Sequence, residues 1–491
     1  MNQSQQERSA VSAIRKLYEG KKASVREVTE LYIGRAKKLN PEINSCVTVI
    51  DSPDGDIYTA EKLFAEGKAS PLTGIPIIIK DNICTKGVLT SCASKMLSDF
   101  IPPYNATVIE KLNALGAVKI AKANMDEFAM GGSGETSYYG ATRNPYNTDC
   151  VPGGSSSGAA AAVSSGICAG ALGSDTGGSI RQPAAFCGVT GLKPTYGAVS
   201  RYGLVAFASS LDQIGPIANS AEDCGLILNA VAGRDPRDAT SLAGTGEDFN
   251  RLIGQSLKGK RLALVSELMG EGTDEAVRLA VEKAARFFRE NGAIVGTVSL
   301  PEINRAIPAY YLIACAEASS NLARFDGIKY GYRASGYADY HELVRKSRME
   351  GFGWEVKRRI LLGAYALSSG YYDDYYKKAV YLKNRLKYQY NEIFKAYDAV
   401  LAPTAPTVAY KIGEQVNNPV QMYVADICTV TVNLAGLPAI STPCAYGNGL
   451  PIGLSIIGRP FSEAVIIQLA DAFERSFDWR APKVWEGCIS C

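Results

Sequence analysis

The chain contains 491 residues, of which 46% are hydrophobic and 21% are charged, and its 52 basic and 49 acidic residues leave a net charge of +3. This composition is typical of a globular protein, and the nearly balanced charge offers no basic face for binding nucleic acid directly. The first residues, MNQSQQERSAV, are polar, and the longest uncharged stretch, 151–174, consists mainly of Gly, Ser and Ala. We therefore expect no secretory signal, no membrane span and a cytoplasmic location.

The 12 cysteines are expected to be reduced thiols, many of them buried, because a long chain without a signal peptide is typical of a reducing compartment. Cys488 and Cys491 form a CxxC pair near the end of the chain. A structural zinc site needs four ligands, and no second cysteine pair lies nearby. We therefore expect a frayed tail there and no metal site.

The first 65 residues are expected to be helical. Val11, Ile14 and Leu17 fall at helical spacing, and Ser24 with Glu27 forms a capping box before a second apolar pattern. An alternating order follows: a buried strand at 75–79, a helix at 105–115 and a second buried strand at 117–124. This order predicts an α/β fold with a large mixed, mostly parallel sheet sandwiched between helices.

Further along, residues 152–194 are dominated by Gly, Ala and Ser, which let backbone segments approach closely. Strands are expected at 260–267, 397–406 and 449–458, and an amphipathic helix at 462–477. Residues 303–397 are helical in pattern and rich in Tyr, and we expect them to form an inserted cap over a site. No repeat or flexible linker interrupts the chain, so we expect one domain over 1–491.

Two glycine-rich loops contain serines that could act as nucleophiles, Ser155 in PGGSSSG and Ser179 in DTGGSIR. A nucleophilic serine needs a base. The only histidine, His341, lies far along the chain, so Lys80 at the end of the isoleucine strand is the better candidate. An ordinary lysine is protonated at neutral pH, and desolvation would have to lower its pKa. The alternative is a surface lysine at the end of a strand.

The second loop also offers backbone N–H groups, at Thr176, Gly177, Gly178 and Ser179, that could surround an oxyanion. Asp175 and Arg181 flank the loop and could pair to hold its shape. A phosphate-binding loop is the competing interpretation of such sequences. Neither loop has the GK[ST] ending of a P-loop, however, and no GxGxxG follows a strand.

Lys80 and the two serine loops, in this order and with these flanking residues, resemble the amidase signature family. Segments 127–147, 191–216, 316–333 and 432–444 are similar to the A subunits of bacterial glutamyl-tRNA(Gln)/aspartyl-tRNA(Asn) amidotransferases, and the likeness covers about residues 10–480. The resemblance implies the amidase signature fold and a Ser-cis-Ser-Lys triad. In that triad Ser179 is the nucleophile, Ser155 the bridging serine with a cis peptide bond, and Lys80 the base.

The resemblance also implies a reaction and its partners. Glutamine would be hydrolysed through an acyl-enzyme on Ser179, with Arg359 meeting its carboxylate, Asp426 its ammonium, and Tyr310 lining the pocket. Ammonia would pass to a B subunit that uses ATP and Mg²⁺ and binds the tRNA, while a small C subunit stabilises the complex. No cofactor is expected in this chain itself. From the residues alone, Arg359 beside Lys357 and Arg358 could equally lie on a solvated helix face.

Two other functions remain open. A free-standing amidase acting on another small amide would not need the opposite charges of Arg359 and Asp426 in its pocket. A non-catalytic assembly subunit would not need Lys80, Ser155 and Ser179.

Overall fold

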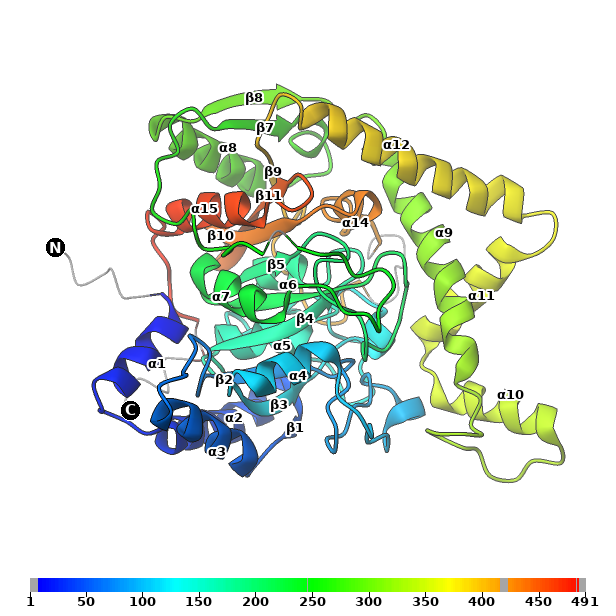
Figure 1. The fold of residues 1–491 in the computed structure, drawn as a ribbon. Helices are drawn as coiled ribbons and strands as arrows, with labels where there is room; N and C mark the ends of the chain where they lie inside the picture. The colour runs from blue at the N-terminus through cyan, green and yellow to red at the C-terminus, as the bar shows by residue number, and fades with distance from the viewer. Residues whose placement is uncertain (1–7, 245, 416–422, 483, 485–491) are drawn as a thin grey trace.

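A mixed β-sheet of eleven strands forms the centre of this computed structural model, which describes residues 8–244, 246–415, 423–482 and 484. The strands lie in the order β1-β3-β2-β4-β6-β5-β10-β11-β9-β7-β8 (Figure 1). They are β1 (Cys46–Val49), β2 (Pro76–Lys80), β3 (Val118–Ala123), β4 (Gly170–Asp175), β5 (Thr190–Lys193), β6 (Gln213–Ala218), β7 (Arg261–Val265), β8 (Ile294–Val298), β9 (Ala399–Pro403), β10 (Ala439–Gly447) and β11 (Leu450–Gly458).

The parallel part of the sheet is smaller than the sequence suggests. β2 pairs in parallel with β3 and β4, and β7 pairs in parallel with β8 and β9. The other six pairings are antiparallel. The α/β fold with a mixed sheet is confirmed, but the prediction of a mostly parallel sheet is wrong. That prediction rested on the β–α–β order around β2 and β3, whereas strands that also form antiparallel pairs, such as β4 (GALGSD) with β6, carry little strand periodicity.

Strands β10 and β11 form a hairpin, of which only the second strand was predicted, at 449–458. They are joined by Asn448 and Gly449, which have φ values of 52° and 80°. Two-residue hairpin turns with positive φ at both positions favour the Asn-Gly pair. The Asn-Gly dipeptide was therefore a readable signal for β10, which was not predicted.

Helices cover both faces of the sheet. On strand β2, Ile77 and Ile79 pack into the core on one face and Ile78 into the core on the other, as the alternation of side chains along a strand requires. The helices are α1 (Ala10–Glu19), α2 (Val25–Ile43), α3 (Asp54–Ala65), α4 (Thr107–Ala114), α5 (Ser157–Ser164), α6 (Arg181–Phe186), α7 (Ala221–Val231), α8 (Glu275–Glu290), α9 (Ile303–Asn321), α10 (Tyr340–Gly351), α11 (Trp354–Leu367), α12 (Lys378–Ile393), α14 (Val430–Ala435) and α15 (Glu463–Glu474).

At the N-terminal end, the predicted capping box is present. Ser24 Oγ accepts from the Glu27 N–H, and the Glu27 carboxylate accepts from the Ser24 N–H. The expectation of helices over 1–65 is confirmed for α1, α2 and α3, but it missed β1, a four-residue strand that pairs with β3. Residues 1–7 lie outside the described residues.

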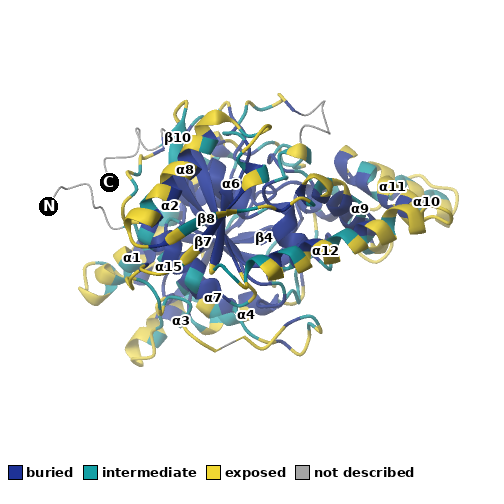
Figure 2. Cartoon of the chain, turned by 90° about the horizontal axis from the view of Figure 1, so that it is seen from above, coloured by how far each residue is buried: buried dark blue, intermediate teal, exposed yellow. Residues whose placement is uncertain are grey.

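Helices α9 to α12 confirm the helical pattern predicted for 303–397, and they form an arm at one end of the molecule (Figure 1). We use "helical arm" for residues 303–393. Figure 2 shows the buried sheet at the centre and many exposed residues along this arm. Helix α9 packs on α11, α12 and α14, so its inner side joins the body while other faces remain open.

Candidate active site

Lys80 ends β2, the strand hydrogen-bonded between β3 and β4, and its side chain is wholly buried. The alternative of a surface lysine is therefore wrong. Its Nζ donates to Ser155 Oγ at 2.8 Å, to Ser174 Oγ at 3.0 Å and to the Ser174 carbonyl at 3.2 Å. The strand thus aims one amine at the loop that contains Ser155.

Burial lowers the pKa of Lys80 to about 7, against the opposing effect of the carboxylates of Asp126, Asp175 and Asp212. A large fraction of this amine is therefore uncharged at neutral pH. A neutral amine has two N–H groups and one lone pair. In the neutral state Nζ can donate only two of its three hydrogen bonds. In the third bond Nζ becomes the acceptor, and a serine hydroxyl such as that of Ser155 can donate to it.

The two serine loops are joined through their backbones. The Ser156 N–H donates to the Ser179 carbonyl at 3.0 Å, and the Asp126 N–H donates to the Ser155 carbonyl at 3.2 Å. The peptide bond between Gly154 and Ser155 is cis. Ser155 is buried, whereas Ser179 is the one partly exposed residue between 174 and 180. Among the described residues, the Ser179 hydroxyl forms no hydrogen bond, so it is open towards a ligand.

The predicted pair of Asp175 and Arg181 is present and wholly buried, with Nε to Oδ2 at 2.9 Å. Asn433 Nδ2 donates to the same carboxylate at 2.8 Å, and the Arg181 guanidinium holds the pKa of Asp175 below its usual range. The charged network of Asp175, Arg181 and Asn433 therefore holds the loop between residues 175 and 181 in place. Only an intact carboxylate can accept all of these bonds.

This network corrects the set of oxyanion donors. The Gly178 N–H donates to Asp175 Oδ1 at 2.8 Å, so it is already occupied and does not face a ligand. The N–H groups of Thr176, Gly177 and Ser179 form no hydrogen bond to any described residue. Three of the four expected donors therefore remain free.

The side chains of Tyr310 and Thr429 pack against the backbone of this loop. A Cβ on Gly177 would lie 2.4 Å from Tyr310 Oη, and a Cβ on Gly178 would lie 2.4 Å from Thr429 Oγ1. Thr429 Oγ1 also donates to the Gly177 carbonyl at 2.6 Å. The two glycines are therefore needed for close packing, and Tyr310 lies directly against the loop.

Arg359 is buried, so the alternative of a solvated helix face is wrong. Its Nε donates to Glu355 at 2.7 Å, one turn earlier on α11. The guanidinium lies 5.0–5.5 Å from the ring centres of Tyr311, Phe207 and Tyr423. A guanidinium stacked on aromatic rings and held by a carboxylate keeps a fixed position.

Asp426 lies beside this aromatic group. It is partly exposed, and Tyr311 Oη donates to its Oδ2 at 2.8 Å. Burial raises the pKa of Asp426 to about 7. Tyr310 and Tyr311 have ring centres 5.0 Å apart. The structure therefore connects the Ser179 loop to Arg359 and Asp426 through two adjacent tyrosines of α9.

Several residues of this arrangement were missed by the sequence analysis. Tyr311 follows Tyr310 directly, and Glu355 stands four residues before Arg359, a spacing that pairs charges on a helix. Tyr311 and Glu355 could therefore have been recognised from their positions in the sequence. Ser174 and Asp126 had no such signal, because only the folded chain brings them to Lys80 and the Ser155 loop.

His341 lies on the exposed part of α10 and takes no part in the site. The ten described cysteines are buried, as expected, whereas Cys488 and Cys491 lie outside the described residues. Within the described ranges, no cluster of His, Cys, Asp and Glu is suited to a metal ion. None of the helices in those ranges is both long and apolar enough to cross a membrane.

Comparisons with known proteins agree with this geometry. The family model named Amidase matches residues 27–467. The chain is 52% identical over 472 residues to the A subunit of glutamyl-tRNA(Gln) amidotransferase from Caldanaerobacter subterraneus subsp. tengcongensis, covering 96% of this chain and 97% of the relative. It is 51% identical over 487 residues to the protein of the same name from Nitrosospira multiformis, covering 98% and 100%.

Solved structures show the same fold. The crystal structure of the A subunit of glutamyl-tRNA(Gln) amidotransferase from Thermotoga maritima superposes with a TM-score of 0.79 at 39% identity, covering 94% of this chain and 98% of that one. The peptide amidase of Stenotrophomonas maltophilia gives 0.83 at 29% identity, covering 98% and 99%. The chain therefore belongs to the amidase family and is an enzyme of that family.

Proposed function

We propose that this chain is the glutamine-hydrolysing subunit of a tRNA-dependent amidotransferase. The observation that carries the proposal is the buried Lys80 Nζ, 2.8 Å from Ser155 Oγ, in a loop whose backbone is joined to that of Ser179. A nucleophilic serine needs a base, and where no histidine is near, Lys80 can act as that base on Ser179 through Ser155.

In the proposed mechanism, neutral Lys80 takes the hydroxyl proton of Ser155, which in turn takes the proton of Ser179. Ser179 Oγ attacks the side-chain amide carbon of glutamine. The negative oxygen that forms would be held by the free N–H groups among Thr176, Gly177 and Ser179. The proton then returns from Lys80 through Ser155 to the leaving nitrogen. Ammonia departs, and water hydrolyses the glutamyl ester on Ser179.

The substrate is assigned from the opposite charges of the pocket. Arg359 would hold the α-carboxylate of glutamine, and Asp426 its α-ammonium, with Tyr310 against the side chain. A ligand with both charges on one carbon fits the guanidinium and carboxylate that Tyr311 connects. An uncharged amide would leave both groups without a ligand partner.

The relatives named above are A subunits, so the proposal includes partner subunits, with the roles that the resemblance implies. Ammonia would pass to a B subunit that binds ATP, Mg²⁺ and the mischarged tRNA, and a small C subunit would complete a cytoplasmic complex. This chain would hold no cofactor and would meet tRNA only through its partner. Glutaminase activity is then expected to be weak alone and to rise with the partner subunits and tRNA.

The test is to trap the intermediate. The chain with its partner subunits is incubated with L-glutamine, stopped with acid and digested, and the Ser179 peptide is examined by mass spectrometry. A glutamyl ester on Ser179 is expected in the native chain, and none in Ser179→Ala. Unchanged glutamine turnover in Ser179→Ala would overturn the proposal.

Assays on the same preparation distinguish the alternative function, a free-standing amidase. Equal glutaminase rates with and without partner subunits, or faster hydrolysis of an uncharged aliphatic amide than of glutamine, would favour that second function. Absence of any turnover in the full complex, with the chain folded, would favour an assembly subunit.

A further inference from the structure

Exposed hydrophobic side chains are concentrated on the helical arm. Of the 26 large hydrophobic residues that are exposed in the described ranges, fifteen lie between residues 328 and 388. Such residues are ordinarily scattered singly over a protein surface, so their concentration makes the arm a candidate interaction surface, and two of them, Tyr375 and Tyr381, line a groove on it. The catalytic arrangement does not use these fifteen residues.

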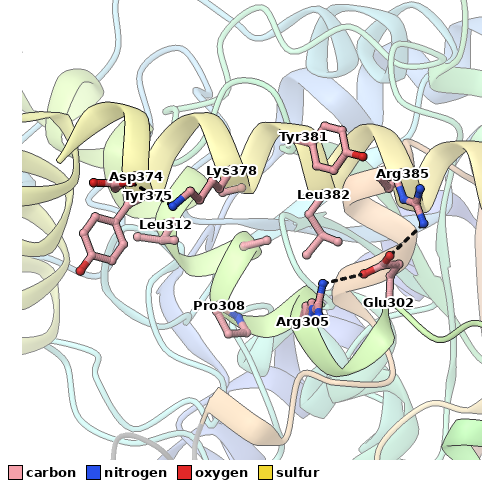
Figure 3. A pocket seen from close by; sticks show the side chains of 12 residues that line it. Glu302, Arg305, Pro308, Leu312, Asp374, Tyr375, Lys378, Tyr381, Leu382 and Arg385 are labelled. Carbon is pink, nitrogen blue, oxygen red and sulfur yellow. Dashed lines mark hydrogen bonds and ion pairs between the residues drawn. The ribbon is translucent and has the colours of Figure 1, made fainter.

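A groove of about 590 Å³ runs between α9 and α12 on this arm (Figure 3). Its apolar lining comes from both helices: Pro308, Ala309, Leu312, Ala379 and Leu382. Along α12, Lys378, Leu382 and Arg385 follow each other at spacings of four and three, on one helix face. The groove therefore has an apolar floor with charged residues along its edges.

The exposed charge of the groove is mainly positive. Glu302 is bound by Arg305 at 3.7 Å and by Arg385 at 3.2 Å. The Glu302 side chain is only 15% exposed, whereas those of Arg305 and Arg385 are 76% and 49% exposed. Asp374 pairs with Lys378 at 2.9 Å. A ligand in the groove therefore meets three cations and one open carboxylate.

The part of the helical arm around the groove also has a positive net charge. Apart from the buried pair of Arg359 and Glu355, residues 354–395 contain eight Lys and Arg against three Asp and Glu. Two copies of this surface would repel each other, so a second copy of the chain is a poor occupant. RNA is also disfavoured, because the floor is aliphatic and the exposed carboxylate of Asp374 would face the phosphates.

We propose that this groove binds an amphipathic helix of another protein. Its apolar stripe would lie on Leu312 and Leu382, and its acidic flanks would meet Arg305, Lys378 and Arg385. Recognition of a helix in an apolar groove uses anchors spaced by three and four residues, which the two groove helices can accommodate. The inference goes beyond the proposed function, because it concerns a surface separate from the Ser179 site.

The test uses a fluorescent synthetic peptide of about 18 residues that is helical, with a leucine stripe and glutamate flanks. Its binding to the full chain is measured by fluorescence anisotropy. Arg305→Glu is expected to raise the Kd about tenfold, through repulsion of the acidic flank. The matched control is Arg345→Glu on α10, because Arg345 makes the same kind of contact with Glu342, also at 3.7 Å, and does not line the groove. It should change the Kd less than twofold.

A second variant tests the floor. Leu382→Gln should weaken binding of the glutamate-flanked peptide at least tenfold, and the native chain should bind a lysine-flanked version equally poorly. Thermal unfolding and glutaminase activity of each variant show that the chain is folded. Failure of the proposed function would leave these binding results unchanged.

Four results would overturn the inference. They are equal affinity for the two peptides, equal weakening by Arg305→Glu and Arg345→Glu, tighter binding of a single-stranded RNA that displaces the peptide, and self-association of the chain that Arg305→Glu abolishes.

Discussion

The Glu127 carboxylate accepts hydrogen bonds from the Gly353 N–H, at 3.1 and 2.9 Å. Gly353 precedes α11, and Arg359 stands on that helix less than two turns further on. Ser94 Oγ donates to the same carboxylate. One buried acid therefore fastens the helix that carries Arg359 to the body of the molecule, beside the loop that Asp126 joins to Ser155.

This contact predicts an effect on substrate binding. In Glu127→Gln only one oxygen remains to accept from Gly353 and Ser94, so the start of α11 is held less firmly. We expect KM for glutamine to rise about three- to tenfold with kcat within about twofold, because remote positioning acts on binding. Glu350→Gln, an exposed change on α10, is the control. A loss of kcat at unchanged KM would contradict this account.

Replacement of the proposed base should abolish the chemistry without unfolding the chain. Lys80→Met removes the amine and leaves an apolar chain of similar length in a buried site. Loss of one member of such a catalytic set costs about 10³- to 10⁴-fold or more in kcat. Steady-state glutaminase assays and thermal unfolding are measured together, with Ser179→Ala as the reference. Retained turnover in Lys80→Met would rule out Lys80 as the base.

The lowered pKa of Lys80 predicts a pH profile. Its amine is protonated below pH 7 and neutral above it, and only the neutral form can accept a proton. The activity kcat/KM should therefore rise with pH and level off above a midpoint near 7.

Asp426, whose pKa is also raised to about 7, must be ionised to bind an ammonium, so its titration acts in the same direction. The profile of Asp426→Asn separates the two groups, because the midpoint should persist there if it belongs to Lys80. A profile without a midpoint between about pH 6 and 9 would contradict the assignment of Lys80.

The pocket charges predict a change of specificity. Arg359→Lys cannot reproduce the planar guanidinium beside the stacked rings of Tyr311 and Tyr423, and Asp426→Asn removes the negative charge. Each is expected to raise KM for glutamine about 10- to 100-fold, in the range of a lost charged hydrogen bond. Residual hydrolysis of an uncharged aliphatic amide should stay within about threefold of the native rate. An equal loss for both substrates would mean that these residues serve only the fold.

Gly177 predicts a steric effect at the Ser179 loop. A methyl group in Gly177→Ala would lie 2.4 Å from Tyr310 Oη, so either the loop or Tyr310 must move. We expect kcat to fall about 10-fold or more, because small displacements of oxyanion donors are costly. Gly34→Ala, where nothing lies within 4 Å of the added carbon on helix α2, should leave activity unchanged. Smaller side chains at position 310 should partly restore Gly177→Ala.

Much of the fold could be predicted from local pattern. The isoleucine run of β2, the capping box of Ser24 and the helical spacing of the arm depend on neighbours in sequence, and the structure confirms them. Strands made of small residues, such as β4, were missed, because their pairing depends on partners distant in sequence. The balance of parallel and antiparallel pairings was wrong for the same reason.

The sequence by itself determined which groups are available: one lysine after an apolar strand, two serines in glycine-rich loops, and a single histidine far along the chain from both loops. Only the tertiary structure decided what those groups experience. Burial of Lys80 between β3 and β4 removes the water that would keep its amine charged, and the carboxylate of Asp175 occupies the Gly178 N–H that the sequence left open. Solvation and hydrogen-bond partners are properties of the packed chain, because residues far apart in sequence supply them.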